Sequence, residues 1–577
     1  MESWITDSPF NERFRYYTRG NADEVGPDPW SPLGWTMAWE KGCCPGVAGG
    51  YVEYGVFDLE EFPHETRSVF GLWGGYFYNC LSMTWVFGVR MPGATPEAIN
   101  QAYFGDRPGV PEYEEHPDDI KEEAEALVNE SMAWVMSTED YPMMEERSET
   151  ARQAVKNRPD HSKSSNEELV EYAREMVELL EYVWVPSCVA ALACSLGPGA
   201  VQAICDGIGR SEDAVKLMSA VGDVESAGAS FRMWDLSRVI RDSEELSGIF
   251  DGNNDEILEK IRESDSDDAR AFLDLWDELI EECGHRGPNE WDMRSHSWTT
   301  KPELPIGMLE RLRLQEDDKS PHLASVKSAE TREKLTAEVL DLVKDDEETH
   351  GTLSAAIKSA ALFFGMREMG KNAAIRSIHE AKLAMMELGK RMVEQGAIDD
   401  LQQLFMLTES ELDSFVADPM SMRDTILERD KDFSYLHEVE PPYIVDGKVG
   451  IPPISEWPKR GSKKSGPAKT GEVLQGSGGA PGVATGTARV ILDPSDASSL
   501  EPGDVMIAPT TDPSWTPLFM TASAVVVNVG AVASHAAIVS RELGIPCAVS
   551  VADATDRITD GCTITVDGST GTVTIES

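Results

Sequence analysis

Residues 529–546, VGAVASHAAIVSRELGIP, contain one histidine at a point where a helix is expected to begin. The apolar run AVVVNV that precedes this segment is typical of a buried strand. Gly530 and Ala531 permit a tight turn, and Ser534 is a suitable N-cap for the helix HAAIVSREL. The pattern predicts that His535 occupies the first helical position.

The first turn of a helix offers backbone N–H groups without helical partners and the positive end of the helix dipole. Both favour an anion and disfavour an imidazolium, so we expect the ring of His535 to be neutral, nucleophilic and turned toward solvent. A phosphoryl group carried on a ring nitrogen would be held by the same N–H groups. These residues leave two interpretations open, a phosphohistidine and a histidine that only caps a turn.

The elements around His535 indicate a small α/β domain over 473–577. Short β-type runs follow one another here: GTARVIL, DVMIAP, SAVVVNV, CAVSV, CTITVDG and GTVTI. Two helices interrupt them, one after Asp512–Pro513 and one that begins at Ser534. A length of about 105 residues is a normal domain size.

The preceding 440 residues are predicted to form a mainly helical domain, 1–440, joined to the α/β domain by a linker, 441–472. The linker is rich in Pro, Gly, Ser and Lys and has no period. Residues 1–100 are rich in Trp, Tyr, Gly and Pro, and we expect irregular chain with short helices there. Apolar periodicity predicts helices at 165–184, 255–262, 268–283, 330–344, 352–364 and 372–395. Capping boxes are expected at Ser165–Glu168 and Thr408–Glu411.

Charge and cysteine usage exclude some classes of function. The chain has 102 acidic and 51 basic residues, a formal charge of -51, which argues against binding nucleic acid or anionic membranes. Nine scattered cysteines without a CxxC pair indicate reduced thiols, and the N-terminus resembles no signal peptide. The most apolar stretch is broken by Pro and Gly and predicts buried helix and turn. We therefore expect a cytoplasmic protein.

Four segments resemble the swivelling phosphohistidine domain of phosphoenolpyruvate-utilising enzymes: GSGGAPGVATGTARV, LEPGDVMIAPTTDPSWTPLF, VGAVASHAAIVSRELGIPCAV and ATDRITDGCTITVDGSTGTV. They cover nearly all of 475–575. The resemblance implies that His535 carries phosphate and that Gly530, Ser534 and Arg541 support it. Ala531 is a departure, because the family commonly has a second glycine there.

Upstream segments resemble the substrate-binding domain of rifampin phosphotransferases and related aromatic dikinases. They are YYTRGNADEVGPDPWSPLGW, GHRGPNEWDMRSHSW and MREMGKNAAIRSIHEAKLAMMELGKRMVEQGAIDDLQQLFMLTESEL. The resemblance implies a multidomain protein, in which a mostly α-helical substrate-binding domain is followed by the small α/β domain. It does not suggest the (β/α) barrel that binds pyruvate.

The same resemblance implies a partner. Such enzymes load the histidine with an ATP-grasp domain, in a dikinase cycle that converts ATP to AMP, phosphate and the phosphorylated acceptor. Because no ATP-grasp pattern is recognisable in this chain, we expect a separate ATP-grasp nucleotide-binding subunit, and hence a hetero-oligomer. ATP is the expected phosphoryl donor, and Mg²⁺ is expected to travel with it on the partner. No metal-binding constellation can be picked out in this chain.

The segment GHRGP combines residue types that suit phosphoryl transfer. His285 is the candidate general base for the acceptor hydroxyl, and Arg286 is a candidate clamp for phosphate or carboxylate. Glu290 can orient either side chain. The alternative is a helix C-terminus, where His and Arg meet the carbonyl end and glycine supplies the turn.

Two further cations are candidates for binding the substrate or its phosphate. Arg367 and Lys371 are four residues apart on an expected helix, so they are neighbours that an anion would stabilise. Alternatively, Glu368 neutralises them.

The aromatic N-terminal region leaves two further pairs of alternatives open. Arg19 can bind an anion, or it can stack on Tyr16 or Tyr17. Several rings can line an apolar pocket or form ordinary core: Trp30, Trp35, Trp73, Tyr76 and Phe77.

Three functions remain in competition. The first is a dikinase-type phosphotransferase subunit that acts on a hydroxylated aromatic small molecule, such as a hydroxyacetophenone in aromatic catabolism. The second is a component that phosphorylates a rifamycin-type antibiotic. The third is a noncatalytic phosphocarrier or regulatory subunit, which an enclosed acceptor pocket near His535 would argue against.

Overall fold

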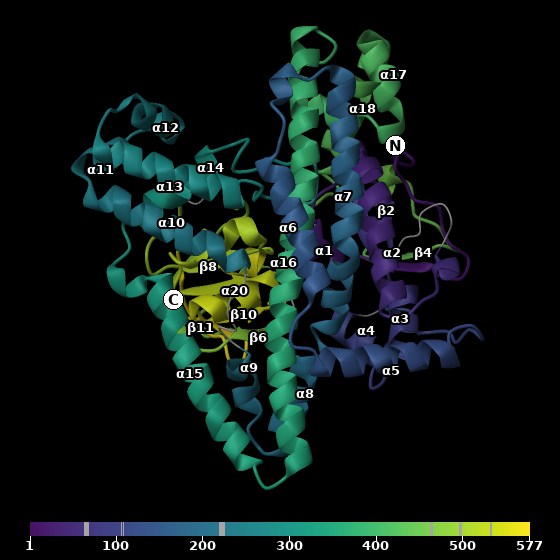
Figure 1. The fold of residues 1–577 in the computed structure, drawn as a ribbon, viewed down its shortest axis with the longest axis vertical. Coiled ribbons are helices and arrows are strands. Elements are labelled where there is room, and N and C mark those ends of the chain that lie inside the picture. The colour runs from purple at the N-terminus through teal and green to yellow at the C-terminus, as the bar shows by residue number, and fades with distance from the viewer. Residues whose placement is uncertain are drawn as a thin grey trace. The chain divides into compact units, whose positions relative to one another are not determined.

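The computed structural model describes the chain apart from residues 63–68, 105–106, 108, 219–224, 462–465, 495–498, 531–533 and 577, so Ala531 lies outside the described residues. Contacts between residues divide it into two compact units. The first unit consists of Met1–Cys194, Trp291–Ser295 and Met369–Lys463, and the second of Ser195–Glu290, His296–Glu368 and Lys464–Ser577. The fold-class prediction is confirmed, because a large helical region precedes a smaller α/β region (Figure 1). The boundaries at 440 and 472 stay predictions.

Helices form most of the first unit. Their bounds are α1 Ala22–Val25, α2 Cys44–Glu53, α3 Leu81–Arg90, α4 Pro96–Phe104, α5 Glu122–Ser137, α6 Pro142–Lys156, α7 Asn166–Ala193, α17 Leu412–Ala417 and α18 Arg423–Leu436. The capping box predicted for α7 is present, since Ser165 and Glu168 each accept a hydrogen bond from the other's backbone N–H. Glycines at 42, 46 and 50 let the π-helix Gly34–Cys43 and α2 approach α7, because a Cβ at these positions would crowd α7 side chains.

A four-stranded antiparallel sheet joins three strands from 1–100, where irregular chain was expected, to one strand from the predicted linker 441–472. Its order is β2-β3-β1-β4, with β1 Tyr16–Thr18, β2 Phe70–Trp73, β3 Tyr76–Cys80 and β4 Ile444–Asp446. Gly74 and Gly75, both at positive φ, form the two-residue connection between β2 and β3. Two glycines at positive φ match the twist of a hairpin. The prediction of irregular chain was therefore wrong here, although this glycine pair is a turn signal that the sequence contains.

One continuous helix replaces the two helices predicted at 352–364 and 372–395. Helix α16 spans Glu347–Glu394 and passes through Gly365 and Gly370. A glycine inside a helix costs only about 1 kcal/mol relative to alanine, which the packing of a long apolar face outweighs. Gly370 also has a packing reason, because a Cβ there would overlap the hydroxyl of Ser187 in α7.

The second unit combines helices with the C-terminal sheet. The helices that precede the sheet are α8 Leu196–Gly207, α9 Ala214–Leu217, α10 Glu225–Asp242, α11 Glu244–Phe250, α12 Asn254–Glu263, α13 Asp267–Cys283, α14 Glu303–Leu312 and α15 Pro321–Leu342. Figure 1 shows α10, α13 and α14 packed in a layer beside the C-terminal sheet.

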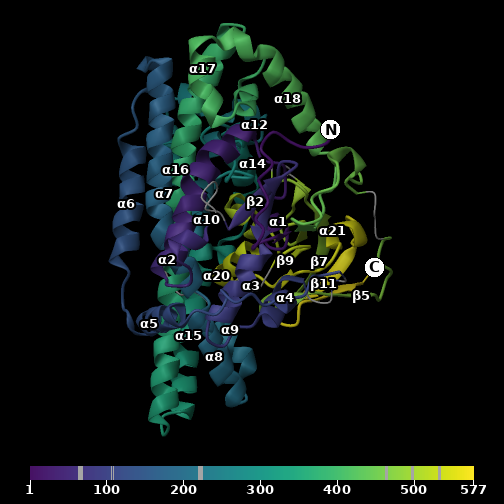
Figure 2. The ribbon, with the colours of Figure 1, turned by 90° about the vertical axis from the view of Figure 1, so that its right-hand side faces the viewer.

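Eight strands form the C-terminal sheet in the order β5-β12-β11-β7-β8-β9-β10-β6 (Figure 2). Their bounds are β5 Val473–Gln475, β6 Ser477–Ala480, β7 Val483–Val490, β8 Val505–Ala508, β9 Ala524–Val527, β10 Cys547–Val549, β11 Thr563–Asp567 and β12 Thr572–Ile575. Strands β7 to β10 are parallel to one another, and the remaining pairs are antiparallel. The buried central strands β8 and β9 are continuous apolar runs, as parallel strands covered on both faces require.

Three short helices accompany this sheet: α19 Thr516–Phe519, α20 His535–Leu543 and α21 Ala554–Arg557. One apolar core joins α19 and α20 to the helical layer, with Met233 and Trp234 of α10 in the same cluster as Phe519 and Ala536. Outside this apolar core, Arg311 of α14 pairs with Glu501 at 3.1 Å. The face of the sheet that carries His535 is therefore packed against helices within the second unit.

Among the described residues, one helical segment, Asn166–Gly207, is long and apolar enough to cross a membrane by length and composition. Within its most apolar window, 44% of the residues are buried in the protein. Core helices of globular proteins pass the same test, so a single such segment is weak evidence for a membrane span.

We predict that Gly568→Ala destabilises the second unit. A Cβ at Gly568 would overlap the carbonyl oxygen of Ala480 and lie 2.5 Å from the amide nitrogen of Cys547, so β6 and β10 would have to move. Overpacking of this kind costs about 1–3 kcal/mol. Urea unfolding of the full chain measures the loss. Gly466→Ala is the control, because nothing lies within 4 Å of a Cβ there, and equal stability of the two variants would contradict the packing argument.

Candidate functional site

His535 is the first residue of α20, as the sequence predicts. The helix begins directly after Ser534, whose extended backbone places it at the N-cap, and ends at Gly544 in the left-handed conformation. Ser534 therefore occupies the predicted N-cap position, but its hydroxyl makes no capping hydrogen bond. Gly530 keeps this turn compact, because a Cβ there would lie 3.0 Å from the Ser534 hydroxyl.

The ring of His535 is buried, which contradicts the prediction that it faces solvent. The residue is 9% exposed. The Thr511 hydroxyl lies 3.0 Å from Nδ1 and the Thr516 hydroxyl 3.1 Å from Nε2, while Phe519 packs edge-on at 5.9 Å between ring centroids. The prediction failed because α19 and the residues before it fold over the ring, a tertiary contact that the sequence around His535 does not contain.

This pair of threonines constrains the chemistry of the ring. A neutral imidazole has one N–H donor and one acceptor nitrogen, and a hydroxyl can serve either, so the pair can satisfy both ring nitrogens and fix the orientation of the ring. A nitrogen lone pair that accepts a hydroxyl hydrogen bond is not free to attack phosphorus. Phosphorylation therefore requires that one threonine release its nitrogen and that the ring become accessible. We missed Thr511 and Thr516 in the sequence, because nothing in a separation of 24 or 19 residues relates them to His535.

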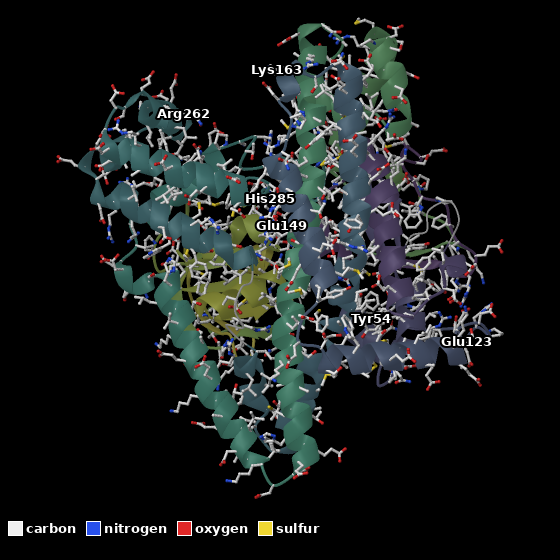
Figure 3. The ribbon with its side chains drawn as sticks, viewed as in Figure 1. Tyr54, Glu123, Glu149, Lys163, Arg262 and His285 are labelled. Carbon is white, nitrogen blue, oxygen red and sulfur yellow. The ribbon has the colours of Figure 1, made fainter. Side chains whose placement is uncertain are left out.

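The GHRGP segment is buried in the second unit. Helix α13 ends at Cys283, and His285, Arg286 and Glu290 follow it as buried residues; Figure 3 labels His285. The Arg286 guanidinium lies 3.3 Å from both carboxylate oxygens of Glu290. Burial lowers the pKa of Arg286, but the carboxylates of Glu290 and Glu368 more than offset it, and the net pKa is raised.

The structure therefore shows features of both interpretations of GHRGP. Glu290 orients Arg286, as one of them expects, and the segment also begins at a helix C-terminus, as the other expects. The glycines serve backbone packing, because a Cβ at Gly287 would overlap the carbonyl oxygen of His296. The catalytic role of His285 and the clamp role of Arg286 stay predictions.

Arg367 and Glu368 on α16 contribute to the same charged region of the second unit. Glu368 is buried and interacts electrostatically with Arg286. Arg367 and Glu368 line a pocket together with Arg541 of α20. The structure thus brings Arg286 of GHRGP close to Glu368, and it brings Arg367 and Glu368 beside Arg541 of the helix that carries His535.

Lys371 and Arg19 belong to the first unit. The Lys371 ammonium lies 6.0 Å from the centre of the Trp291 ring, a cation–π arrangement. Arg19 is buried, donates to the carbonyl oxygens of Phe77 and Gly26, and pairs with Asp23. These contacts use its donors for structure.

The ring partners predicted for Arg19 were wrong, because its guanidinium lies over Tyr76 and Tyr78 instead of Tyr16 or Tyr17. Both rings stand on β3, which the sequence analysis had assigned to irregular chain.

The N-terminal aromatic residues form core. Trp35 and Trp39 on the π-helix stack at 6.0 Å, and Trp39 packs against Phe77 at 4.8 Å. The five rings named above as pocket or core are all buried: Trp30, Trp35, Trp73, Tyr76 and Phe77. This burial favours the interpretation as core.

We predict that freeing the ring of His535 raises its chemical reactivity. In Thr511→Val/Thr516→Val both hydroxyls are lost while the side-chain volume is kept. Each hydrogen bond contributes about 0.5–1.5 kcal/mol, so modification of His535 by diethyl pyrocarbonate is expected to become about tenfold faster. Mass spectrometry of the α20 peptide measures this rate. Thr565→Val, which removes an exposed hydroxyl from the same sheet, is the control, and equal rates in all three proteins would refute the constraint.

Two regions of the chain match family models of known proteins. Residues 186–368 match the family model described as rifampicin phosphotransferase fourth domain, and residues 500–571 match the one described as PEP-utilising enzyme, mobile domain.

The chain is similar to curated proteins along part of their length. It is 28% identical over 393 residues to an uncharacterised phosphotransferase of Bacillus subtilis, covering 64% of this chain and 44% of that protein. It is 26% identical over 374 residues to a rifampicin phosphotransferase of Bacillus subtilis, with coverages of 64% and 42%. It is 30% identical over 308 residues to a rifampicin phosphotransferase of Bacillus cereus, with coverages of 52% and 34%.

The chain thus spans less than half the length of each of these relatives. The mobile-domain match includes the helix that begins at His535, and the fourth-domain match includes GHRGP and the Arg367–Glu368 pair. Over these two regions, 186–368 and 500–571, the chain is similar to phosphoenolpyruvate-utilising enzymes.

Proposed function

We propose that this chain is the acceptor-binding and phosphohistidine-carrying component of an ATP-dependent phosphotransferase. The observation that carries the proposal is the position of His535, which begins a helix in a domain that matches the mobile domain of phosphoenolpyruvate-utilising enzymes. The first turn of α20 presents backbone N–H groups that can hold the oxygens of a phosphoryl group on the ring.

The proposed reaction has two transfers at His535, with a hydrolysis between them. In the first, a ring nitrogen of His535 attacks the β-phosphorus of ATP, the N–P bond forms and the P–O bond to AMP breaks. Water then attacks the γ-phosphorus of the diphosphoryl group on the ring, the P–O bond between the two phosphorus atoms breaks, and phosphate leaves. In the second transfer, the acceptor hydroxyl oxygen attacks the phosphorus that remains on the ring and the N–P bond breaks, while the hydroxyl proton passes to a base. His285 is our candidate for that base, and Arg286, Arg367 and Lys371 are candidates for holding the phosphoryl oxygens.

Loading of His535 requires a nucleotide-binding component. We propose that an ATP-grasp subunit outside these 577 residues supplies it, that it holds ATP with Mg²⁺, and that the cycle yields AMP and phosphate. Among the described residues, no group of three His, Cys, Asp or Glu side chains is placed to hold a metal ion. We also keep the proposal that the complex is cytoplasmic.

The burial of His535 adds a step to this scheme. In the arrangement described here the ring is enclosed by Thr511, Thr516 and Phe519, so neither substrate can reach it. Movement of the α/β domain away from the helical layer would expose the ring for loading, and its return would place α20 against α16. Swivelling of this kind is a gating motion, in which the conformational change precedes chemistry.

For the acceptor we propose a hydroxylated aromatic small molecule. Lys371 beside Trp291 supplies a cation next to an aromatic face, a combination suited to an aromatic ring that bears an anionic phosphate. A rifamycin-type antibiotic is the second candidate acceptor, and the match of 186–368 to the rifampicin phosphotransferase fourth domain favours it. A noncatalytic phosphocarrier is the third candidate function.

We predict that His535→Asn abolishes phosphorylation of this chain. The full chain is incubated with the candidate ATP-grasp partner and ATP labelled at the β and γ positions, and acid-labile, base-stable label is counted. His322→Asn, an exposed histidine of the second unit, is the control and should keep full labelling. Label that persists in His535→Asn would overturn the proposal.

The same incubation, with a panel of phenols and a rifamycin, decides among the candidates. A phosphorylated phenol together with AMP supports the aromatic dikinase, and a phosphorylated rifamycin supports the antibiotic phosphotransferase. Labelling of His535 without any phosphorylated acceptor supports the carrier. Turnover of ATP by this chain alone would contradict a separate loading subunit.

We predict that a deletion within 461–467 abolishes turnover and leaves the melting temperature unchanged. A longer deletion, across 455–470, would remove residues that are packed. Trp457 is buried, Arg460 pairs with Asp28, and Ala468 donates to the carbonyl oxygen of Arg557. A deletion across Trp457 is therefore expected to lower the melting temperature.

Turnover is measured with the nucleotide-binding partner and melting by circular dichroism. Full turnover in the 461–467 deletion would contradict swivelling, because the His535 ring would then not need to travel.

A further inference from the structure

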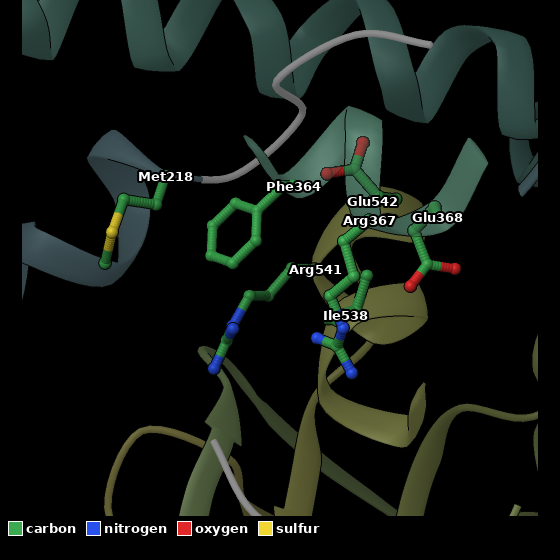
Figure 4. A pocket seen from close by; sticks show the side chains of 7 residues that line it. All are labelled: Met218, Phe364, Arg367, Glu368, Ile538, Arg541 and Glu542. Carbon is green, nitrogen blue, oxygen red and sulfur yellow. The ribbon is translucent and has the colours of Figure 1, made fainter. Parts of the chain in front are cut away.

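A small pocket separates α20 from α16 in the second unit (Figure 4). Its main lining residues are Ile538, Arg541 and Glu542 on α20 and Phe364, Arg367 and Glu368 on α16. Figure 4 labels these side chains and shows Arg541 and Arg367 coming from two different helices. His535 is not among the lining residues, so the pocket is a place distinct from the ring nitrogens.

Arg541 is buried without acceptors for one edge of its guanidinium. The residue is 8% exposed, and in the part of the chain that the structure describes neither Nε nor Nη2 has a hydrogen-bond partner. These two nitrogens form the fork that binds carboxylate or phosphate through two parallel hydrogen bonds. Burial lowers the pKa of Arg541 to about 10, with the nearby carboxylate of Glu542 opposing the shift only in part.

A comparison with Arg286 shows why this is unusual. Arg286 is equally buried, but both carboxylate oxygens of Glu290 lie within hydrogen-bond distance and its pKa is raised. A buried cation without such a partner is costly, and an anion that reached Nε and Nη2 would remove much of that cost. Arg367, half-buried on α16, lines the same pocket, as do the carboxylates of Glu368 and Glu542.

The size of the pocket restricts the anion. It offers a cavity of about 10 Å³, room for a single water-sized group. An aromatic ring does not fit such a space, whereas one oxygen of a small tetrahedral anion does. The remaining oxygens of that anion would lie outside this space, toward the opening of the pocket.

We propose that Arg541 and Arg367 form an oxyanion site that binds a dianionic phosphate, either inorganic phosphate or the phosphoryl group of a phosphate monoester. The choice of phosphate among anions rests on the proposed function, since phosphate and a phosphorylated acceptor are both products of the cycle. The two arginines stand on different parts of the second unit, one on α20 behind His535 and one on α16. Bound phosphate therefore stabilises the packing of α20 against α16, and its departure favours separation.

The test is calorimetric titration of inorganic phosphate into the full chain. We expect saturable binding that weakens at least about tenfold in Arg541→Met, because a bidentate, charge-assisted contact is lost. Arg367→Met is expected to weaken binding less, because this side chain is half-buried. Arg489→Gln is the matched control, since that arginine of β7 is already paired with Asp504 and should leave phosphate binding unchanged.

Thermal melting supplies a second readout that does not depend on activity. Phosphate should raise the melting temperature of the unaltered chain by mass action and leave that of Arg541→Met unchanged. Without phosphate, Arg541→Met should melt at a higher temperature than the unaltered chain, because a buried charge without acceptors has been removed. Lower stability of Arg541→Met without phosphate would indicate that Arg541 already has a structural partner, and would overturn the proposal.

His535→Asn separates this site from the phosphohistidine site. We expect it to bind phosphate within about twofold of the unaltered chain, because the pocket does not include position 535. If His535→Asn abolishes phosphate binding and Arg541→Met does not, the anion lies at the first turn of α20, and the proposal fails. Conversely, if the unaltered chain forms no phosphohistidine when incubated with ATP and the ATP-grasp partner, the proposed function is refuted and the proposal of an oxyanion site is unaffected.

Phenyl phosphate titrated in the same way distinguishes the two sources. Tighter binding of inorganic phosphate than of phenyl phosphate identifies the free ion as the ligand, and the reverse order identifies the monoester. No measurable binding of either to the unaltered chain would overturn the assignment.

Discussion

The burial of the His535 ring between two threonine hydroxyls is the constraint on which the rest of the structure depends. A ring that carries a phosphoryl group must expose a nitrogen, yet both nitrogens here lie about 3 Å from hydroxyls and the residue is buried. Hydroxyls are suited to this because each can donate or accept, and two hydrogen bonds to hydroxyls are weak enough to be broken when the ring moves. The enclosed ring is thus compatible with a resting position from which transfer must begin by movement.

Two buried arginines of the second unit, Arg286 and Arg541, differ in whether their guanidinium groups have hydrogen-bond acceptors. Arg286 and Glu290 satisfy each other, and the glycines around them serve the backbone, so this motif has a structural role whatever else it does. Arg541 has no such partner on its forked edge. A fold tolerates an uncompensated buried cation at the expense of stability, and such groups concentrate at places where function requires them. Helix α20 therefore presents two different groups at its two ends, an imidazole and a guanidinium.

In the first unit, the aromatic residues and Arg19 make structural contacts. Its aromatic residues fill a core around the π-helix, and Arg19 uses its donors on backbone carbonyl groups. Lys371 of the same unit lies beside the ring of Trp291 in a cation–π arrangement.

The sequence by itself determined the local elements, and the tertiary structure decided what surrounds the chemistry. The start of α20 at His535, the strands β8 and β9 and the capping box of α7 could be predicted, because each depends on residues within a few positions of one another. The Gly74–Gly75 hairpin was equally local and was missed although its signal was present. The unbroken α16 was missed because glycines at 365 and 370 weaken a helix less than long-range packing supports it.

By contrast, the enclosure of His535 by Thr511 and Thr516, the approach of Glu368 to Arg286 and the position of Arg541 in a pocket with Arg367 all join segments far apart in the chain. Neither spacing nor composition encodes such contacts. They arise only when apolar faces of α10, α19 and α20 pack into one core and bring the polar groups at their edges together.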